Sequence, residues 1–86
     1  MDDRLDELAR HLRATAERPV ERSASRWLGE AQALAVDLAE HDLDPAVRQE
    51  RLDTVASLLS NVEETGDERA DERVDAARAI VAALRE

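Results

Sequence analysis

Residues 45–85 read PAVRQERLDTVASLLSNVEETGDERADERVDAARAIVAALR, and this stretch decides the fold. Its apolar residues recur at intervals of three and four, which is the spacing of one face of a helix and not of a strand. The pattern is interrupted at Gly66-Asp67, where Gly66 can adopt the left-handed conformation that follows a helix end and Asp67 can cap the next helix. So short a connection brings consecutive helices alongside each other. The stretch therefore predicts an antiparallel hairpin of helices over residues 45–64 and 68–85.

Upstream of the hairpin the same spacing continues and predicts two more helices, over residues 3–17 and 20–40. Pro19 stands between them. Because proline removes a backbone donor and clashes with the preceding helical turn, it either ends the helix or kinks it there. Asp44 and Pro45 mark the next boundary, since Asp44 suits an N-cap and Pro45 the first helical position. The whole 86-residue chain is thus predicted to be a single all-α domain, a small antiparallel bundle of three to four helices with a C-terminal helical hairpin.

Each predicted helix has one apolar face, and these faces are expected to form the core. In chain order they comprise Leu5, Leu8, Leu12 and Ala16; Ala24, Trp27, Ala31, Leu34 and Leu38, widened by Leu28 and Ala35; Leu52, Val55, Leu59 and Val62, with Leu58 beside them; and Ala70, Val74, Ala77, Val81 and Leu84. Large apolar side chains (Leu, Val, Ile, Met and Trp) number only 21. Because a single core of this size supplies only ~3–5 kcal/mol, we expect self-association, in which a second copy covers the remaining apolar surface.

The composition is acidic, with 21 Asp and Glu against 12 basic residues, all of them Arg, and a net charge of −9. This bulk charge excludes a surface that attracts nucleic acid or an anionic membrane. At molar ionic strength the Debye length falls to ~3 Å, so a carboxylate-rich surface is screened from its own repulsion. Salting-out salts also strengthen the burial of small apolar side chains. The composition is typical of proteins from salt-loving archaea, and an acidic domain of a mesophile is the alternative.

The N-terminal sequence and the apolar runs bear on location. No apolar run approaches the ~20 residues that a membrane span needs. The N-terminus, Met1-Asp2-Asp3-Arg4, is acidic where a signal peptide is basic. A cytoplasmic location and no membrane partner are therefore expected.

The chain offers few groups for catalysis or metal binding. Cysteine is absent, which excludes disulfides and thiolate sites. Each histidine follows a carboxylate by four residues, His11 after Glu7 and His41 after Asp37, but a surface histidine beside a carboxylate is the commoner meaning of this spacing. The carboxylates of residues 63–72 lack the pattern of a calcium loop and are expected to form a solvated acidic rim. We predict no catalytic residue, no metal site and no cofactor, and hence no enzyme.

Charge order is the feature that departs from an even acidic surface. Residues 8–26 hold five Arg against two Glu, whereas residues 27–47 hold five acids and no cation. Such asymmetry can orient two copies or select an acidic partner, and it can equally reflect ion pairing within the chain. Inside a predicted helix, Gly29 costs about 1 kcal/mol relative to alanine, so it marks either close approach of another helix or of a partner, or a tolerated surface position. The candidate partner-binding residues are Arg10, Arg13, Arg22, Arg26, Trp27 and Gly29.

Three short motifs lie along the predicted helices: Arg26-Trp27-Leu28-Gly29-Glu30-Ala31, then Leu58-Leu59, then Glu64-Thr65-Gly66-Asp67. They resemble a family of short archaeal helical proteins in which an amphipathic helix, a second helix, a Gly-Asp turn and an alanine-rich last helix follow one another. The likeness covers about residues 22–85, although the last helix lacks the aromatic residues of that family. The family carries no established activity, so the resemblance implies a helical fold and an archaeal source and leaves the function open.

Three functional hypotheses follow. The first is a non-enzymatic helical interaction module of a halophilic archaeon that forms a homodimer and binds neither nucleic acid nor membrane. The alternative is an accessory or regulatory subunit that docks on a larger enzyme or transcription complex through Trp27, Gly29 and the arginine-rich segment 10–26. The third, a small metal or nucleotide enzyme, requires a metal coordinated by His11 or His41.

Overall fold

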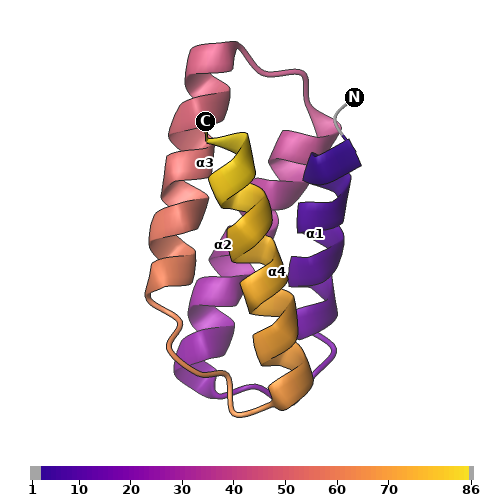
Figure 1. Cartoon of the computed structure of the whole chain (residues 1–86), viewed down its shortest axis with the longest axis vertical. Helices are drawn as coiled ribbons and strands as arrows, with labels where there is room; N and C mark the ends of the chain where they lie inside the picture. Colours follow the sequence, from indigo (N-terminus) through magenta and orange to yellow (C-terminus); the bar gives the residue numbers. More distant parts are fainter. Residues whose placement is uncertain (1–2, 86) are drawn as a thin grey trace.

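The computed structural model describes residues 3–85, which contain four helices and no strand. The helices are α1 (Asp3–Thr15), α2 (Arg22–Glu40), α3 (Pro45–Ser60) and α4 (Glu68–Leu84). They run alternately down and up the long axis, so each helix is antiparallel to the next (Figure 1). The predicted all-α bundle is confirmed. None of the helices in this range has the length and apolarity needed to cross a membrane.

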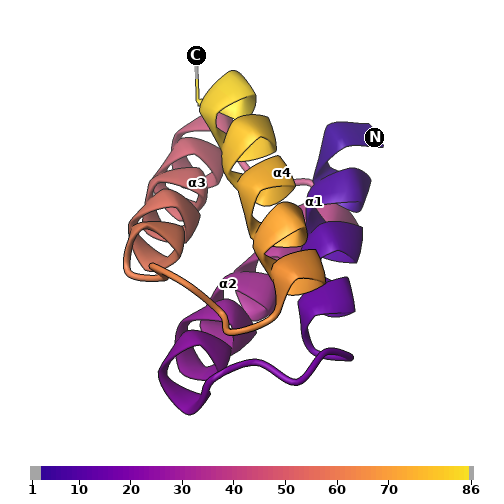
Figure 2. The ribbon, with the colours of Figure 1, turned by 60° about the horizontal axis from the view of Figure 1, so that its bottom comes forward.

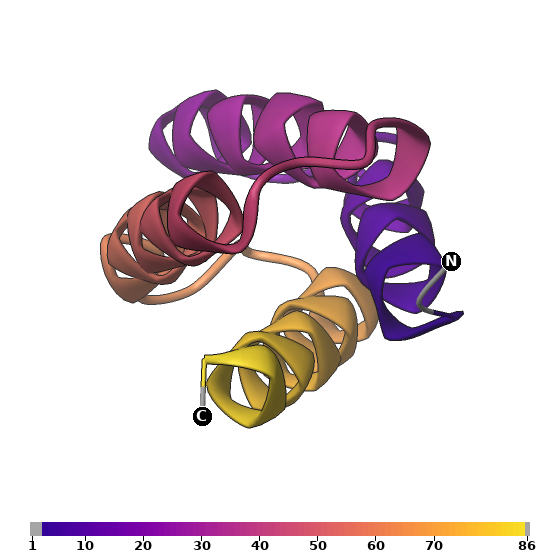
Figure 3. The same cartoon turned by 90° about the horizontal axis from the view of Figure 1, so that it is seen from above.

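The helices form a ring in which each one packs against two neighbours. Contacts join α1 to α2, α2 to α3, α3 to α4, and α4 back to α1. Within the described residues, no Cα atoms of the diagonal pairs α1–α3 and α2–α4 come within 8 Å of each other. Figure 3 shows the ring from above, with α2 lying opposite α4. Each helix therefore turns one face to the shared core and leaves its outer face uncovered by the other helices.

The core is one cluster to which all four helices contribute. The largest fully buried side chains include Leu8, Leu12, Leu52 and Leu59. Full burial of such a side chain stabilises the fold by about 1.5–3 kcal/mol. The face predicted for α4 is correct at every position: Ala70, Val74, Ala77, Val81 and Leu84 are all buried.

The face predicted for α2 was wrong at two positions. Trp27 and Leu34 are only half-buried, and Leu28 and Ala35 take the inward positions instead. Successive residues of a helix are separated by about 100°, so residues 24, 28, 31 and 35 point in nearly one direction while residues 27 and 34 lie on its flank. The inward side of α2 consequently buries alanine at three of its five core positions.

Pro19 lies in a connection between two separate helices and does not kink a continuous helix. α1 ends at Thr15, short of the predicted end at residue 17, and α2 begins at Arg22 rather than at residue 20. Thr15 closes α1 by donating a hydrogen bond of 2.6 Å from Oγ1 to the carbonyl of Leu12. Ala16 is therefore outside the helix and exposed, not part of the core face as expected.

α3 ends at Ser60, well before the predicted residue 64. Arg78 of α4 donates from Nη2 to the carbonyl of Leu59 at 2.8 Å and also to the carbonyl of Val62. A cation at this position satisfies carbonyls that lack partners within a helix and interacts favourably with the negative end of its dipole. Val62 remains buried, as predicted, although it lies beyond the helix.

The ends of the predicted helices follow the expected chemistry in part. Asp44 and Pro45 occupy the N-cap and first positions of α3, but the Asp44 side chain makes no capping hydrogen bond. Gly66 has a φ of 85°, the predicted left-handed conformation, but it lies six residues beyond the end of α3 and does not follow that helix directly as expected. Asp67 caps α4, because its side chain accepts a hydrogen bond from the amide of Ala70. The hairpin turn is therefore the part of the connections that sequence predicts best.

The connections over residues 16–21 and 61–67 meet at one end of the bundle, in the foreground of Figure 2. The amide of Glu21 donates a 2.7 Å hydrogen bond to the carbonyl of Thr65. A Cβ added to Gly66 would lie 3.1 Å from Cγ of Glu21, so the two connections approach closely at this point. This junction holds α1 and α2 to the hairpin of α3 and α4.

Candidate functional site

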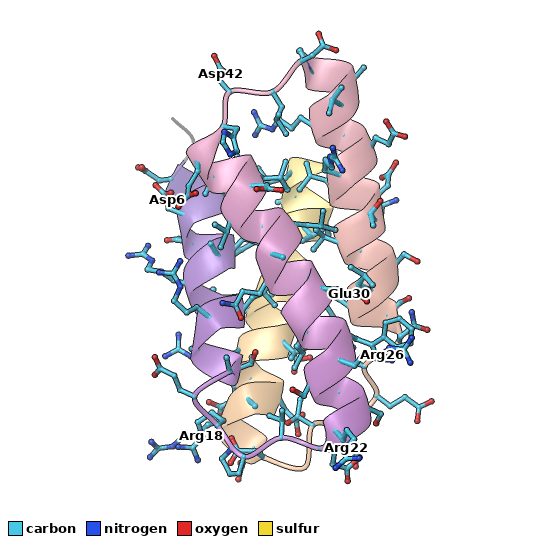
Figure 4. All side chains as sticks on the ribbon, turned by 180° about the vertical axis from the view of Figure 1, so that it is seen from behind. Asp6, Arg18, Arg22, Arg26, Glu30 and Asp42 are labelled. Atoms are coloured by element: carbon cyan, nitrogen blue, oxygen red, sulfur yellow. The ribbon has the colours of Figure 1, made fainter. Side chains whose placement is uncertain are left out.

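The side of α2 that points away from the bundle carries the largest group of predicted partner-binding residues. We call it the α2 outer face, and its members are all exposed: Arg22, Arg26, Gly29, Glu30, Ala33, Asp37 and Glu40. Figure 4 looks onto α2, with Arg22 and Arg26 extending from the first half of the helix and Glu30 following them. The basic residues thus lie toward the N-terminus of α2 and the acidic residues toward its C-terminus.

Trp27 lies on the flank of α2 beside this face and is half-buried. The guanidinium carbon of Arg26 is 5.1 Å from the centroid of the Trp27 ring, within the range of a cation–π interaction. The largest apolar side chain of the chain therefore remains partly exposed while alanines fill the core positions of the same helix. Tryptophan and arginine are the residue types that most often dominate the binding energy of protein interfaces.

Gly29 is exposed in the middle of the α2 outer face. A Cβ added there would meet no atom within 4 Å, so close packing inside the chain does not account for the glycine. Two interpretations remain from the sequence, close approach of a partner or a tolerated surface position.

Arg10 and Arg13 are exposed on α1, whose inward face carries Leu8, Ala9 and Leu12. Arg13 lies in the last turn of α1, where the negative end of the helix dipole favours a cation. Two of the six predicted partner-binding residues therefore lie on α1, and the other four lie on α2.

A hollow of about 530 Å³ lies at the end of the bundle where α2 is connected to α3. Its apolar lining comes from Leu5, Leu38, Ala39 and Leu43, and its polar lining from Glu40, His41, Asp42 and Arg48. Its volume is within the range of ligand pockets, about 300–1,000 Å³. The polar lining combines two carboxylates with an arginine and a histidine, so its charges are of both signs.

The predicted acidic rim of residues 63–72 is only partly solvated. Asp71 accepts hydrogen bonds through Oδ1 from the amide of Thr65 at 2.9 Å and from its hydroxyl at 2.8 Å. Asp67 receives Arg18, with Nε and Nη2 each 2.9 Å from a carboxylate oxygen. The other four carboxylates of the rim are exposed: Glu63, Glu64, Glu68 and Glu72.

The ionisation of Asp67 is shifted by its partners. Hydrogen bonds from the Arg18 guanidinium and then from the Ala70 amide lower the pKa of Asp67 from 3.8 to about 2, against an opposing effect of desolvation. The same contact with Asp67 raises the pKa of Arg18. Both groups are therefore charged at neutral pH, and their contact is structural in character because it joins two connections of the bundle.

The two histidines lie apart at the surface. His11 Nδ1 is 3.1 Å from Nη1 of Arg73 on α4, and His41 Nε2 is 3.9 Å from Oδ1 of Asp37. His41 is also the C-cap of α2, and its amide bonds the carbonyl of Asp37. Over residues 3–85, no three His, Asp or Glu side chains are grouped closely enough to hold a metal ion.

Comparison with protein families gives a match that covers almost the whole chain. Residues 4–86 match a family described as a domain of unknown function (DUF8152). The chain belongs to this family. The DUF8152 match includes every candidate residue on α1 and α2, and it supports the predicted likeness to a family without an established activity. Comparison with curated proteins and with solved structures gave no match.

Sequence reasoning missed two arginines that organise the fold. Arg18 binds Asp67 across 49 residues, and Arg78 binds the end of α3 across 16 and 19 residues. Neither has a local signal, because their partners are distant in sequence and depend on how the helices pack. Among the acids of the α2 outer face, Asp37 was considered only as a neighbour of His41, and Glu40 was not singled out, although the count of acids in residues 27–47 pointed to that segment.

Proposed function

We propose that this DUF8152 chain is a non-enzymatic helical interaction module that associates with another copy of itself through α2. The observation that carries the proposal is the placement of Trp27, which is half-buried beneath the Arg26 guanidinium on the flank of α2. The core positions 24, 31 and 35 of α2 are alanines, whereas the much larger Trp27 of the same helix remains partly exposed. Such a residue is best explained by a protein surface that covers it.

We further propose that the protein works in concentrated salt, as in the cytoplasm of a halophilic archaeon. The net charge of −9, with arginine as the sole basic residue type apart from histidine, supports this. Two copies of so acidic a chain repel each other in dilute buffer, whereas molar salt shortens the range of that repulsion to ~3 Å. Association is therefore expected to require salt.

The test is sedimentation equilibrium in molar potassium chloride across a range of protein concentrations. The wild type is expected to show a reversible dimer, and Trp27→Ala is expected to weaken it. Ile80→Ala is the matched control, because Ile80 is also a half-buried large apolar residue but lies on α4. Equal weakening by both substitutions would indicate a general loss of packing and would count against the role of Trp27.

The accessory-subunit hypothesis is distinguished by recovery of the wild-type chain from a native high-salt lysate. It gains support if a larger protein is recovered in stoichiometric amount with the wild type and is lost with Trp27→Ala. A chain that stays monomeric at all concentrations and retains no such partner would overturn the interaction function itself.

A further inference from the structure

The charges on α2 are placed against the dipole of the helix. Apart from the acidic N-cap, Glu21, its first turns carry Arg22 and Arg26 with no acid in the first turn. Its last turns carry Asp37 and Glu40 with no base in the last turn. Helix dipoles favour the opposite arrangement, with acids at the N-terminus and bases at the C-terminus. α1 and α4 follow that rule, since α1 begins with Asp3 and Asp6 and α4 with Glu68 and Asp71.

The two charged halves of α2 are too far apart to neutralise each other. Residues 26 and 37 are separated by about 16 Å along the axis, and residues 22 and 40 by about 27 Å, at a rise of ~1.5 Å per residue. Within residues 3–85 neither Arg22 nor Arg26 makes an ion pair, including with Glu30, one turn after Arg26. Arg22 and Arg26 are also spaced four residues apart, where like charges destabilise a helix. The arrangement is unfavourable in an isolated chain.

An antiparallel copy of α2 places opposite charges beside the arginines at the start of the helix and beside the acidic residues at its end. If two α2 helices cross near residue 31, then Arg26 faces Asp37 of the partner subunit and Arg22 faces Glu40 of the partner subunit. The twofold axis repeats each pair, and the two helix dipoles then also oppose each other favourably. A parallel arrangement would instead set arginine against arginine.

The centre of the crossing carries the smallest residues of the face, together with Glu30, whose carboxylate would lie near Glu30 of the partner subunit as a pair of like charges. Gly29 and Ala33 are exposed there, and the space beside Gly29 is open. Small residues let helix backbones approach closely, which brings the longer Arg, Asp and Glu side chains on either side within reach of one another. The charge complementarity, and not the small residues alone, selects a second copy as the occupant.

We propose that the α2 outer face binds α2 of a second copy in antiparallel orientation, through paired contacts of Arg22 and Arg26 with Glu40 and Asp37. This rests on the proposed function, which it deepens by naming the partner, the face and the register. Trp27 then lies at the edge of the interface, beside the Arg26 contact.

The test uses two complementary variants of the full chain. The acidic variant carries Arg22→Glu and Arg26→Glu, and the basic variant carries Asp37→Arg and Glu40→Arg. Each variant places the new charges as the helix dipole prefers, so each monomer is expected to fold at least as stably as the wild type, as thermal unfolding at high dilution will show. For each variant alone, the dissociation constant of the dimer is expected to rise about tenfold or more, because every pair of opposite charges becomes a pair of like charges.

Mixing the two variants in equal amounts is expected to restore a dimer that contains one of each, because all four pairs again join opposite charges. Arg51→Glu with Arg69→Glu is the matched control for the acidic variant, since it makes the same change in net charge at exposed positions of α3 and α4, and it is expected to leave the wild-type dimer unchanged. All chains are compared at one salt concentration, because salt alters both net repulsion and ion pairing.

The outcomes separate this inference from the proposed function. A wild-type dimer that persists in both variants would overturn the α2 pairing while leaving self-association through another face intact. A mixture that fails to form the mixed dimer would overturn it as well. A wild type that is monomeric at every concentration would overturn both this inference and the proposed self-association, and would leave only the accessory-subunit hypothesis to be tested with a larger partner.

Discussion

Arg18 and Asp67, 49 residues apart in the sequence, are joined by two hydrogen bonds of 2.9 Å, from Nε and Nη2 of the guanidinium to the two carboxylate oxygens. The fixed fork of arginine makes such a pair more specific than a contact between point charges. It links the connection that precedes α2 to the connection that precedes α4. Together with the hydrogen bond from the Glu21 amide to the Thr65 carbonyl, this ion pair joins the first two helices to the last two at this end of the bundle.

Asp67→Asn is expected to make stability less dependent on pH in acid. The pKa of Asp67 is lowered in the folded chain to about 2 from its ordinary 3.8, so the folded state holds the proton less tightly than the unfolded state. The stabilisation is fully present above about pH 4 and is lost as the pH falls toward about 2. Asparagine can still cap α4, so the substitution isolates the ion pair. Urea unfolding followed by circular dichroism at several pH values measures the slope.

The control for this prediction is Glu68→Gln, which removes a neighbouring but exposed carboxylate. As the pH is lowered, the free energy of unfolding of this variant is expected to decrease as steeply as that of the wild type. An Asp67→Asn variant with the wild-type slope over this pH range would contradict the role given to Arg18.

The two glycines are expected to respond to alanine with opposite signs. Gly66→Ala should destabilise the fold by about 1–2 kcal/mol, because a Cβ in the left-handed region clashes with its own backbone. The new methyl group would also approach Cγ of Glu21 to 3.1 Å. Gly29→Ala should stabilise the monomer by about 0.5–1 kcal/mol, because the helix gains a better former and the site is open. Chemical unfolding at high dilution measures both, and effects of the same sign would show one account to be wrong.

The two buried threonines are expected to differ in how much their hydroxyl groups contribute. Thr65 Oγ1 lies 2.8 Å from both Oδ1 of Asp71 and the carbonyl of Asp67, and it accepts from the amide of Asp67. Thr65→Val should therefore cost about 1–3 kcal/mol, since it leaves buried groups without partners. Thr15 makes a single local bond to Leu12. Thr15→Val, of the same shape, should cost less, and a greater loss at Thr15 than at Thr65 would contradict this ranking.

Arg78→Met is expected to loosen the end of α3. Methionine keeps much of the apolar stem but removes the donors that bind the carbonyls of Leu59 and Val62. Hydrogen bonds to charged groups contribute about 1.5–3 kcal/mol, so a loss of this size is expected in thermal unfolding. Arg51→Met, at an exposed position of α3, is the control and should change stability by less than about 0.5 kcal/mol. Hydrogen exchange at the last amides of α3 should rise only in the Arg78 variant.

Most of the fold could be predicted from the sequence because its signals are local. The buried positions of α4 follow directly from their three-four spacing, and Gly66 and Asp67 act within the turn that they occupy. The face of α2 was harder to predict, because Trp27 and Leu34 fit helical spacing as well as Leu28 and Ala35 do. Only the positions of α1 and α3 on either side of α2 decide which of the two sets points inward.

The helix ends and the candidate surface were less predictable for a different reason. α3 stops where Arg78 reaches its carbonyls, and Arg18 finds Asp67 only once the connections meet. These contacts depend on tertiary packing and leave no pattern in the local sequence. The arginines of the α2 outer face could be singled out from their number, but their exposure, and the open space beside Gly29, required the arrangement of all four helices.

The placement of Trp27 has a practical consequence for spectroscopy. The chain has one tryptophan and neither tyrosine nor phenylalanine, so its intrinsic fluorescence and its near-ultraviolet circular dichroism both originate from a single indole. That indole lies under a guanidinium at the border of the α2 outer face. Binding of a molecule next to Trp27 is therefore expected to change the intrinsic fluorescence of the protein, so association can be followed without a dye or label.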